Sequence, residues 1–231
     1  MNDVGVFSFG RTGSRRCPNK MLRPFGETTL TDLVLSKLAP FGPAAFFAGY
    51  EDEFCAKAER HGVRFVKRDR ASVTCDGPIT AILSFLRGIE PRYVLLVSGC
   101  VPFLQPRTIT AFLERCLGDG CRPAISVRTR RKHFVRQDGT AANFTPAVGT
   151  LNTKMVEPLC ELVDALYFFD RMYFFEHGAY WDWRAVRLIE LADPLETMDI
   201  DEEADFAFVE SLWKAGYGRP IKLKETAHES A

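Results

Sequence analysis

A chain of 231 residues, 46% of them hydrophobic, is long enough to bury one large core, and its formal net charge of zero argues against a general nucleic-acid binder. No apolar stretch approaches the roughly 20 residues that a membrane-spanning helix needs, and the seven scattered cysteines form no C-x-x-C pair. These features predict a cytoplasmic protein with reduced thiols and with neither a membrane nor a nucleic-acid partner.

Short apolar runs alternate with helical patterns over the first 130 residues. The runs rich in valine, phenylalanine and isoleucine predict strands at Val4–Phe9, Ala44–Gly49, Val63–Val66, Tyr93–Val97 and Ala124–Thr129. Between them, helical patterns with capping signals cover 29–38, 51–62, 77–88 and 106–120. Continuous rather than alternating apolarity favours strands that are covered on both faces. The predicted fold is therefore α/β, with a mostly parallel central sheet flanked by helices.

The pattern changes after residue 130. A hairpin with Asp138–Gly139 at its turn is predicted over 130–144. A strand running into a short helix follows over 165–181, then a strand over 185–191 and an amphipathic helix over 201–216. Because no repeat or linker is visible, the sequence predicts one domain over residues 1–231, with disorder at 225–231.

The loop after the first predicted strand, "GRTGSRRCPNK", combines turn residues with an excess of positive charge. Ligands of open α/β sheets bind at the carboxyl ends of strands, so an anion is expected here. The loop is neither a P-loop nor a G-x-G-x-x-G fingerprint. Backbone N–H groups at Gly10, Gly13 and Ser14, with the Arg11 fork and the Lys20 point charge, are suited to surround a triphosphate. The alternative is a solvated basic turn.

Two aspartates near the carboxyl end, Asp199 and Asp201, are separated by one residue. On an extended segment this spacing places both carboxylates on one face. Nucleotide-bound Mg²⁺ commonly takes one or two carboxylates together with phosphate oxygens and waters, so the pair predicts Mg²⁺ or another divalent cation as cofactor. Alternatively, Asp201 and its acidic neighbours Glu202 and Glu203 cap the final helix.

The series Arg11-x-x-Ser14-x-Arg16-x-Pro18-x-Lys20 resembles the R-x-x-S-x-R/G-x-P-x-K signature of the cytidylyltransferases that make CMP-activated sugar acids, the CMP-sialic acid and CMP-Kdo synthetases. The stretches "LLVSGCVPFLQPRTI" (95–109) and "ETMDIDEEADF" (196–206) support the match, which covers nearly the whole chain. The resemblance implies a Rossmann-like nucleotidyltransferase fold, usually as a homodimer. It also implies transfer of CMP from CTP to a nonulosonic or Kdo-like sugar acid, with release of pyrophosphate.

The same resemblance implies roles for individual residues. It implies catalytic roles for Arg11, Lys20 and Asp201; nucleotide contacts from Gly10, Arg11, Gly13, Ser14, Arg16, Lys20, Arg70, Ser98 and Cys100; and metal ligation by Asp199 and Asp201. Arg68 is also in reach of the nucleotide, and the spacing does not choose between it and Arg70. Ser98 stands where the sialic acid branch has a glutamine that faces cytosine. Cys100 stands where the Kdo branch has a metal-binding aspartate, and a thiol is a poor Mg²⁺ ligand.

Charge is segregated along the second half of the chain. The segment Arg122–Arg136 holds six Lys or Arg and no acid, whereas Leu191–Glu210 holds eight Asp or Glu and no Lys or Arg. Within the basic strip Arg128 and Arg130, together with Tyr167, are candidates to bind the anionic sugar acceptor. Aromatic density over 165–183 predicts a dimerisation element, so that 130–183 holds the hairpin and the interface.

Other functions remain open from the sequence. The acceptor is equally compatible with a phosphonate or a sugar phosphate, and a sugar-1-phosphate enzyme using UTP or GTP would share part of the glycine-rich start. A catalytically impaired nucleotide-binding homologue is a further alternative, because Ser98 and Cys100 depart from the family pattern.

Overall fold

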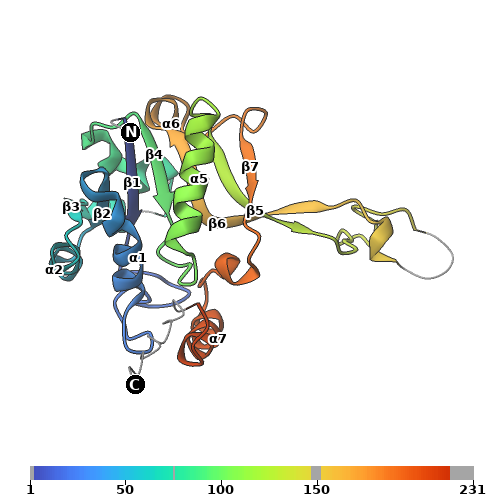
Figure 1. Cartoon of the computed structure of the whole chain (residues 1–231), viewed down its shortest axis with the longest axis horizontal. Helices are drawn as coiled ribbons and strands as arrows, with labels where there is room; N and C mark the ends of the chain where they lie inside the picture. The colour runs from blue at the N-terminus through green and yellow to red at the C-terminus, as the bar shows by residue number, and fades with distance from the viewer. Residues whose placement is uncertain (1–2, 75, 147–151, 219–231) are drawn as a thin grey trace, which may run out of the picture.

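A mixed sheet forms the centre of the structure, a computed structural model that describes residues 3–74, 76–146 and 152–218. Its strand order in the described part of the chain is β3-β2-β1-β4-β6-β5-β7 (Figure 1). The strands are β1 (Val4–Phe9), β2 (Ala45–Gly49), β3 (Arg64–Lys67), β4 (Tyr93–Val97), β5 (Ala124–Arg130), β6 (Leu159–Asp170) and β7 (Arg187–Glu190). β6 runs antiparallel to both its neighbours, and the other pairings are parallel. The predicted α/β fold with a mostly parallel sheet is confirmed.

Helices cover both faces of this sheet. They are α1 (Leu30–Leu38), α2 (Asp52–Arg60), α3 (Arg70–Thr74), α4 (Ile79–Ile82), α5 (Pro106–Gly118), α6 (Arg171–His177) and α7 (Glu203–Lys214). Short 3₁₀ turns lie at Ala39–Ala44, Ser84–Gly88, Thr153–Met155 and Pro194–Thr197. Within the described ranges, no helix is both long enough and apolar enough to cross a membrane.

Two hydrophobic clusters hold the layers together. One joins the sheet to α1, α2, α5 and α7, and the other joins the opposite face to α4, α6 and the turn between α4 and β4. The continuous apolar runs follow from this arrangement, because β1, β2 and β4 are buried along nearly their whole length. The aromatic residues of 165–183 belong mostly to the second cluster: Phe169, Phe174 and Trp181 are buried, and Tyr167 and Tyr180 pack against them.

One predicted helix is interrupted. The helix expected over 77–88 ends after Ile82 and continues as a 3₁₀ turn. The Ile82 carbonyl accepts hydrogen bonds from the Arg68 guanidinium (3.0 Å) and the Ser72 hydroxyl (2.8 Å). Because these side chains occupy the acceptor that the helical ladder needs, the prediction of one continuous helix was wrong.

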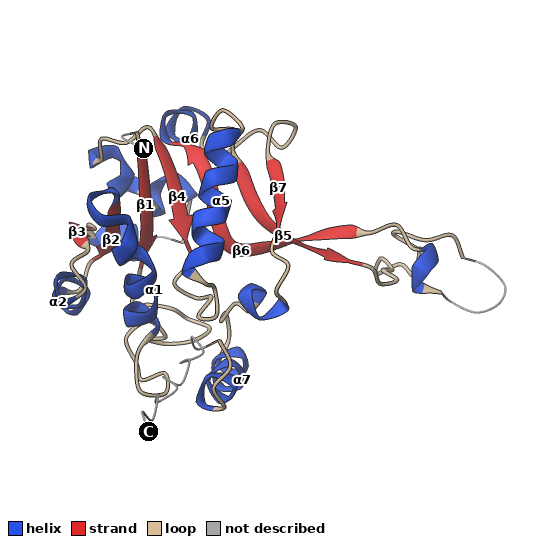
Figure 2. Cartoon of the chain, viewed as in Figure 1, coloured by secondary structure: helices blue, strands red, loops and turns tan. Residues whose placement is uncertain are grey.

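A two-stranded arm projects from the body, formed by the ends of β5 and β6 that extend past the sheet (Figure 2). The register of the pair shifts between Ile125 and Val127, a bulge of the kind that bends a strand. Beyond β5, Val135 pairs with Ala141 across a turn in which Gly139 has a φ of +83°. This turn lies at the predicted Asp138–Gly139 position. The predicted disorder at 225–231 lies outside the described residues.

Candidate active site

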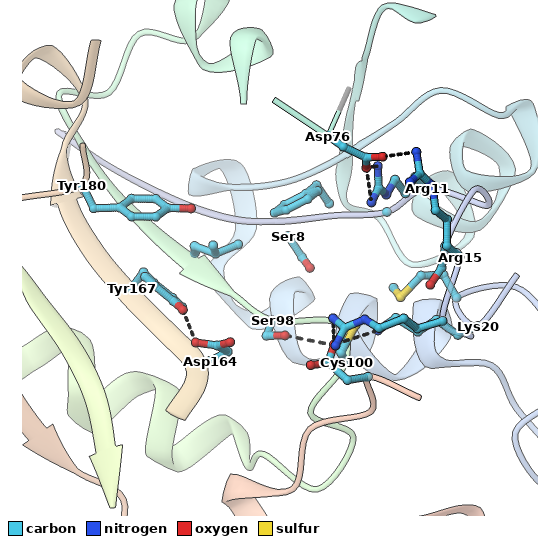
Figure 3. A pocket seen from close by; sticks show the side chains of 18 residues that line it. Ser8, Arg11, Arg15, Lys20, Asp76, Ser98, Cys100, Asp164, Tyr167 and Tyr180 are labelled. Atoms are coloured by element: carbon cyan, nitrogen blue, oxygen red, sulfur yellow. Dashed lines mark hydrogen bonds and ion pairs between the residues drawn. The ribbon is translucent and has the colours of Figure 1, made fainter. Parts of the chain in front are cut away.

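A cavity of about 570 Å³ opens at the carboxyl ends of β1 and β4 (Figure 3). These strands are parallel neighbours, with Phe7 opposite Leu96, so the loops that follow them meet at one edge of the sheet. The predicted residues that line this cavity are Gly10, Arg11, Ser14, Arg16, Lys20, Ser98, Cys100, Tyr167 and Asp201. Segments from the two ends of the sequence, from Gly10 to Asp201, therefore form one site.

The cations of the first loop face carboxylates across the cavity. Arg11 donates to Asp76 (3.3 Å), and Arg15 forms an ion pair with the same carboxylate (2.5 Å). Arg16 pairs with Asp201 at 2.9 Å. The sequence analysis did not single out Arg15 or Asp76, because nothing in the spacing shows that the segment after α3 returns to this loop. The carboxylates act as counterions that an entering phosphate chain would replace.

The backbone of the loop is less available than predicted. The Gly10 N–H donates to the Ala48 carbonyl (3.0 Å), and the Ser14 N–H donates to the Thr12 carbonyl (2.9 Å). Gly13 is exposed and does not line the cavity. The prediction that these three N–H groups are open to a phosphate is therefore wrong for Gly10 and Ser14, since both are used inside the protein. The side chains carry most of the anion-binding capacity.

Arg68 is a structural residue beneath the loop. Its side chain is 1% exposed and donates to the carbonyls of Gly10 (3.1 Å), Ser72 (2.9 Å) and Ile82 (3.0 Å). Burial lowers its pKa to about 10, so the guanidinium stays charged at neutral pH. Arg70 is exposed on α3 and does not line the cavity. The structure thus brings neither arginine into the cavity, in contrast to the predicted nucleotide contact from Arg70.

Lys20 reaches the opposite segment. Its ammonium donates to the Ile200 carbonyl and lies 3.8 Å from the Asp201 carboxylate. The Ile200 N–H in turn donates to the Cys100 carbonyl at 3.0 Å. These contacts join the first loop, the loop after β4 and the segment Asp199–Asp201, the D-x-D segment, at one point.

The two aspartates do not cap the final helix. The cap of α7 is made by Glu202 and Asp205, whose carboxylate accepts the N–H groups of Asp201 (3.1 Å) and Glu202 (2.8 Å). The Asp201 side chain is left to face Arg16 and Lys20. The alternative that Asp201 itself caps this helix is therefore wrong.

Asp199 is half-buried, and one of its carboxylate oxygens is fully covered. Its Oδ1 has no hydrogen-bond partner among the described residues, and burial together with the charge of Asp201 raises its pKa to about 7. A divalent cation bound beside Asp199 would give Oδ1 a partner and would stabilise the ionised carboxylate. The described residues hold no preformed group of three or more Asp, Glu, His or Cys ligands. A cation held by Asp199 and Asp201 would therefore need phosphate oxygens and waters, which is the environment that Mg²⁺ favours.

The loop after β4 carries Ser98 and Cys100. Ser98 donates its N–H to Ala165 (2.9 Å), and its hydroxyl accepts the Cys100 N–H (3.2 Å). Burial raises the pKa of the Cys100 thiol to about 11, although Lys20 acts to lower it. The thiol is therefore neutral at physiological pH and unsuited to coordinate a hard cation.

A second cavity, of about 290 Å³, adjoins the D-x-D segment. Arg128, Arg130, Asp164 and Asp199 line it, and Asp164 also lines the larger cavity. Arg130 is paired with Glu161 at 2.5 Å, and Arg128 donates to the Thr197 hydroxyl at 3.4 Å. The predicted acceptor arginines thus lie beside the metal candidates rather than at the phosphate-binding loop.

Asp164 is not predicted from the sequence. It lies within β6, between the residues paired with the outer part of β5 (Leu159–Leu162) and those paired with β4 (Leu166–Asp170), and it comes to the site because β6 runs antiparallel to β4. The Tyr167 hydroxyl donates to its carboxylate, and this contact and burial raise the pKa of Tyr167.

Residues 10–181 match the family model described as the MobA-like NTP transferase domain. The chain belongs to this nucleotidyltransferase family. The match includes the first loop, β4 and the sheet part of β6, so most residues that line the larger cavity lie within the matched domain, and Ser8, Phe9 and Asp201 lie outside it. The predicted nucleotidyltransferase class is confirmed. A comparison with curated proteins found no match.

Solved structures share the fold. CMP:2-keto-3-deoxy-manno-octonic acid synthetase complexed with CTP is 15% identical, with a TM-score of 0.67, and the match covers 92% of this chain and 98% of that one. A cytidylyltransferase from Leptospira borgpetersenii serovar Hardjo-bovis is 15% identical (TM-score 0.58; 92% and 87%). The 4-diphosphocytidyl-2C-methyl-D-erythritol synthase from Anaerococcus prevotii is 11% identical (TM-score 0.57; 91% and 98%).

The buried arginine gives a first prediction. Arg68→Met should lower the free energy of unfolding by about 2–4 kcal/mol, because the buried carbonyls of Gly10, Ser72 and Ile82 lose their hydrogen-bond donor. Arg70→Met, on the exposed side of α3, should change it by less than about 0.5 kcal/mol. Urea unfolding of both variants measures the difference. Equal stabilities of the two variants would contradict the assigned role of Arg68.

Asp199 gives a second prediction. Because its pKa is raised to about 7, the folded chain holds a proton that the unfolded chain releases above about pH 4. The contribution of this group to stability is therefore lost as the pH rises toward 7. Asp199→Asn should gain about 1–2 kcal/mol relative to the wild type between pH 5 and pH 8. Urea titrations at both pH values measure this gain, and a pH-independent difference would contradict it.

Proposed function

We propose that the protein transfers CMP from CTP to an anionic sugar acid and releases pyrophosphate. The observation that carries the proposal is the meeting of Arg11, Lys20 and Asp201 around one cavity in a nucleotidyltransferase domain. The basic loop signature that produces this meeting is the one that resembles the cytidylyltransferases of sugar acids. All three of the solved structures described above have CTP, cytidylyl or diphosphocytidyl in their names, which supports the choice of nucleotide.

In this proposal the acceptor hydroxyl attacks the α-phosphorus, and the bond to the bridging oxygen of pyrophosphate breaks in line with the attack. Arg11 and Lys20 bind the departing phosphates and stabilise the charge that develops on them. Asp199 and Asp201 would hold Mg²⁺, which when bound neutralises phosphate charge and favours the deprotonated acceptor. The acceptor lies toward the second cavity, where Arg128 binds its anionic group; Tyr167 lines the larger cavity, and Asp164 lines both.

A cytoplasmic location is part of the proposal. The six cysteines in the described ranges are free thiols, which is usual in a reducing compartment.

One assay matrix tests the function. Purified protein is incubated with Mg²⁺, each of CTP, UTP, GTP and ATP, and a panel of sugar acids, sugar phosphates and phosphonates, and pyrophosphate release is followed. CTP with a sugar acid should give the highest turnover. Turnover only with a sugar phosphate or phosphonate would replace the acceptor class, and equal use of UTP would reject cytidine specificity.

Variants test the assigned groups in the same assay. Arg11→Ala, Lys20→Ala and Asp201→Asn should each lower kcat/KM at least about 100-fold, roughly 2.7 kcal/mol of transition-state stabilisation. Cys100→Ser is the matched control in the same cavity and should retain most activity, because the neutral thiol holds no metal. A dead Cys100→Ser variant beside active aspartate variants would contradict the assignment.

A homodimer is the last part of the proposal, with the arm as its interface. Most aromatic residues of 165–183 belong to the second hydrophobic cluster within one chain, so they no longer support the dimer. The arm instead exposes Val135 (63%), Met155 (82%) and Leu162 (46%). Light scattering at micromolar concentration should give twice the chain mass, and Met155→Lys with Leu162→Lys should give a monomer. A monomeric wild type would reject the dimer.

A further inference from the structure

Ser8 is the polar exception in an apolar strand. β1 reads "VGVFSF" and is buried, and the Ser8 side chain is 0% exposed. Its Oγ has no hydrogen-bond partner among the described residues. A buried hydroxyl without a partner destabilises the fold, and alanine at this position would avoid that cost. The unpaired hydroxyl is therefore suited to a hydrogen-bond partner that a bound ligand supplies.

The Ser8 hydroxyl belongs to the wall of the larger cavity. Figure 3 shows the side chain between Tyr167 and Tyr180 on one side and Arg11 and Arg15 on the other. Ser8 is the next-to-last residue of β1, the strand that precedes the loop, and it lies beside the end of β4.

Gly99 keeps this part of the wall open. A Cβ at Gly99 would lie 3.5 Å from the Ser8 Oγ and 2.6 Å from the Met21 Cε. A side chain there would force the end of Met21 to move. Glycine at position 99 therefore leaves space beside the Ser8 hydroxyl in the cavity wall.

We propose that Ser8 hydrogen-bonds the nucleoside part of the bound nucleotide, an inference that rests on the proposed function for the identity of the ligand. The phosphate-binding cations Arg11, Arg16 and Lys20 all follow β1 in the loop. Ser8 precedes that loop, and the apolar side chain of Met21 lies beside it in the cavity wall, on the other side of Gly99. An uncharged, partly apolar group suits this section better than a phosphate does.

The stability of the ligand-free protein is the first arm of the test. Ser8→Ala should raise Tm by about 2–4 °C, because it removes a buried hydroxyl that has no partner. Ser126→Ala is the matched control, since the buried Ser126 hydroxyl is satisfied by Val163 (2.6 Å) and Leu166 (3.0 Å). That variant should lower Tm. A fall of Tm in Ser8→Ala would show that the hydroxyl already has a partner and would overturn the proposal.

Binding is the second arm, measured by titration calorimetry with CTP and with inorganic tripolyphosphate in the absence of acceptor. Ser8→Ala should weaken CTP binding about fivefold and leave tripolyphosphate binding unchanged. Unchanged CTP affinity, or an equal loss for both ligands, overturns the nucleoside contact. If the wild type binds CTP in a Ser8-dependent way but transfers it to no acceptor, the proposed reaction fails and the contact stands.

Discussion

The contact of Lys20 with Ile200 joins two segments of the chain that are 180 positions apart. Lys20 donates to the Ile200 carbonyl and faces the Asp201 carboxylate, while Arg16 pairs with the same carboxylate. A basic loop alone would be a solvated turn, and an acidic segment alone would be a helix start. Their contact places cations and carboxylates around one cavity, which is what a magnesium-dependent reaction of a triphosphate requires.

The contact depends on buried polar groups that hold each segment in place. Arg68 fixes the Gly10 carbonyl, and Glu51 accepts the Thr12 N–H (3.4 Å) and hydroxyl from the other side of the loop. The D-x-D segment is anchored by Glu196, which accepts the N–H of Gln105 (3.2 Å) at the start of α5. These groups lie outside the cavity, yet they set the positions of the side chains within it. The geometry of the cavity therefore depends on residues that do not line it.

The sequence predicts the fold well because its signals are local. Continuous apolar runs such as Tyr93–Val97 correspond directly to buried strands, and the Gly178 stop of α6 has the left-handed φ of +69° that glycine accommodates. The site is predicted where spacing encodes it, as in the Arg11 to Lys20 series. Asp76, Asp164 and Ser8 were missed because their roles depend on register and on the antiparallel course of β6, which no local pattern reveals. The open N–H groups of Gly10 and Ser14 were mispredicted because their acceptors, Ala48 in β2 and Thr12 in the loop, are brought to them only by the fold.

A crystal structure with CTP and Mg²⁺ would show where the nucleotide binds. The triphosphate should lie against Arg11, Arg16 and Lys20, with Asp76 and Asp201 released from their present ion pairs and a cation at Asp199. The nucleoside should lie within hydrogen-bond distance of Ser8. A nucleotide bound away from the ends of β1 and β4, with the ion pairs of Arg11 and Arg16 intact, would contradict it.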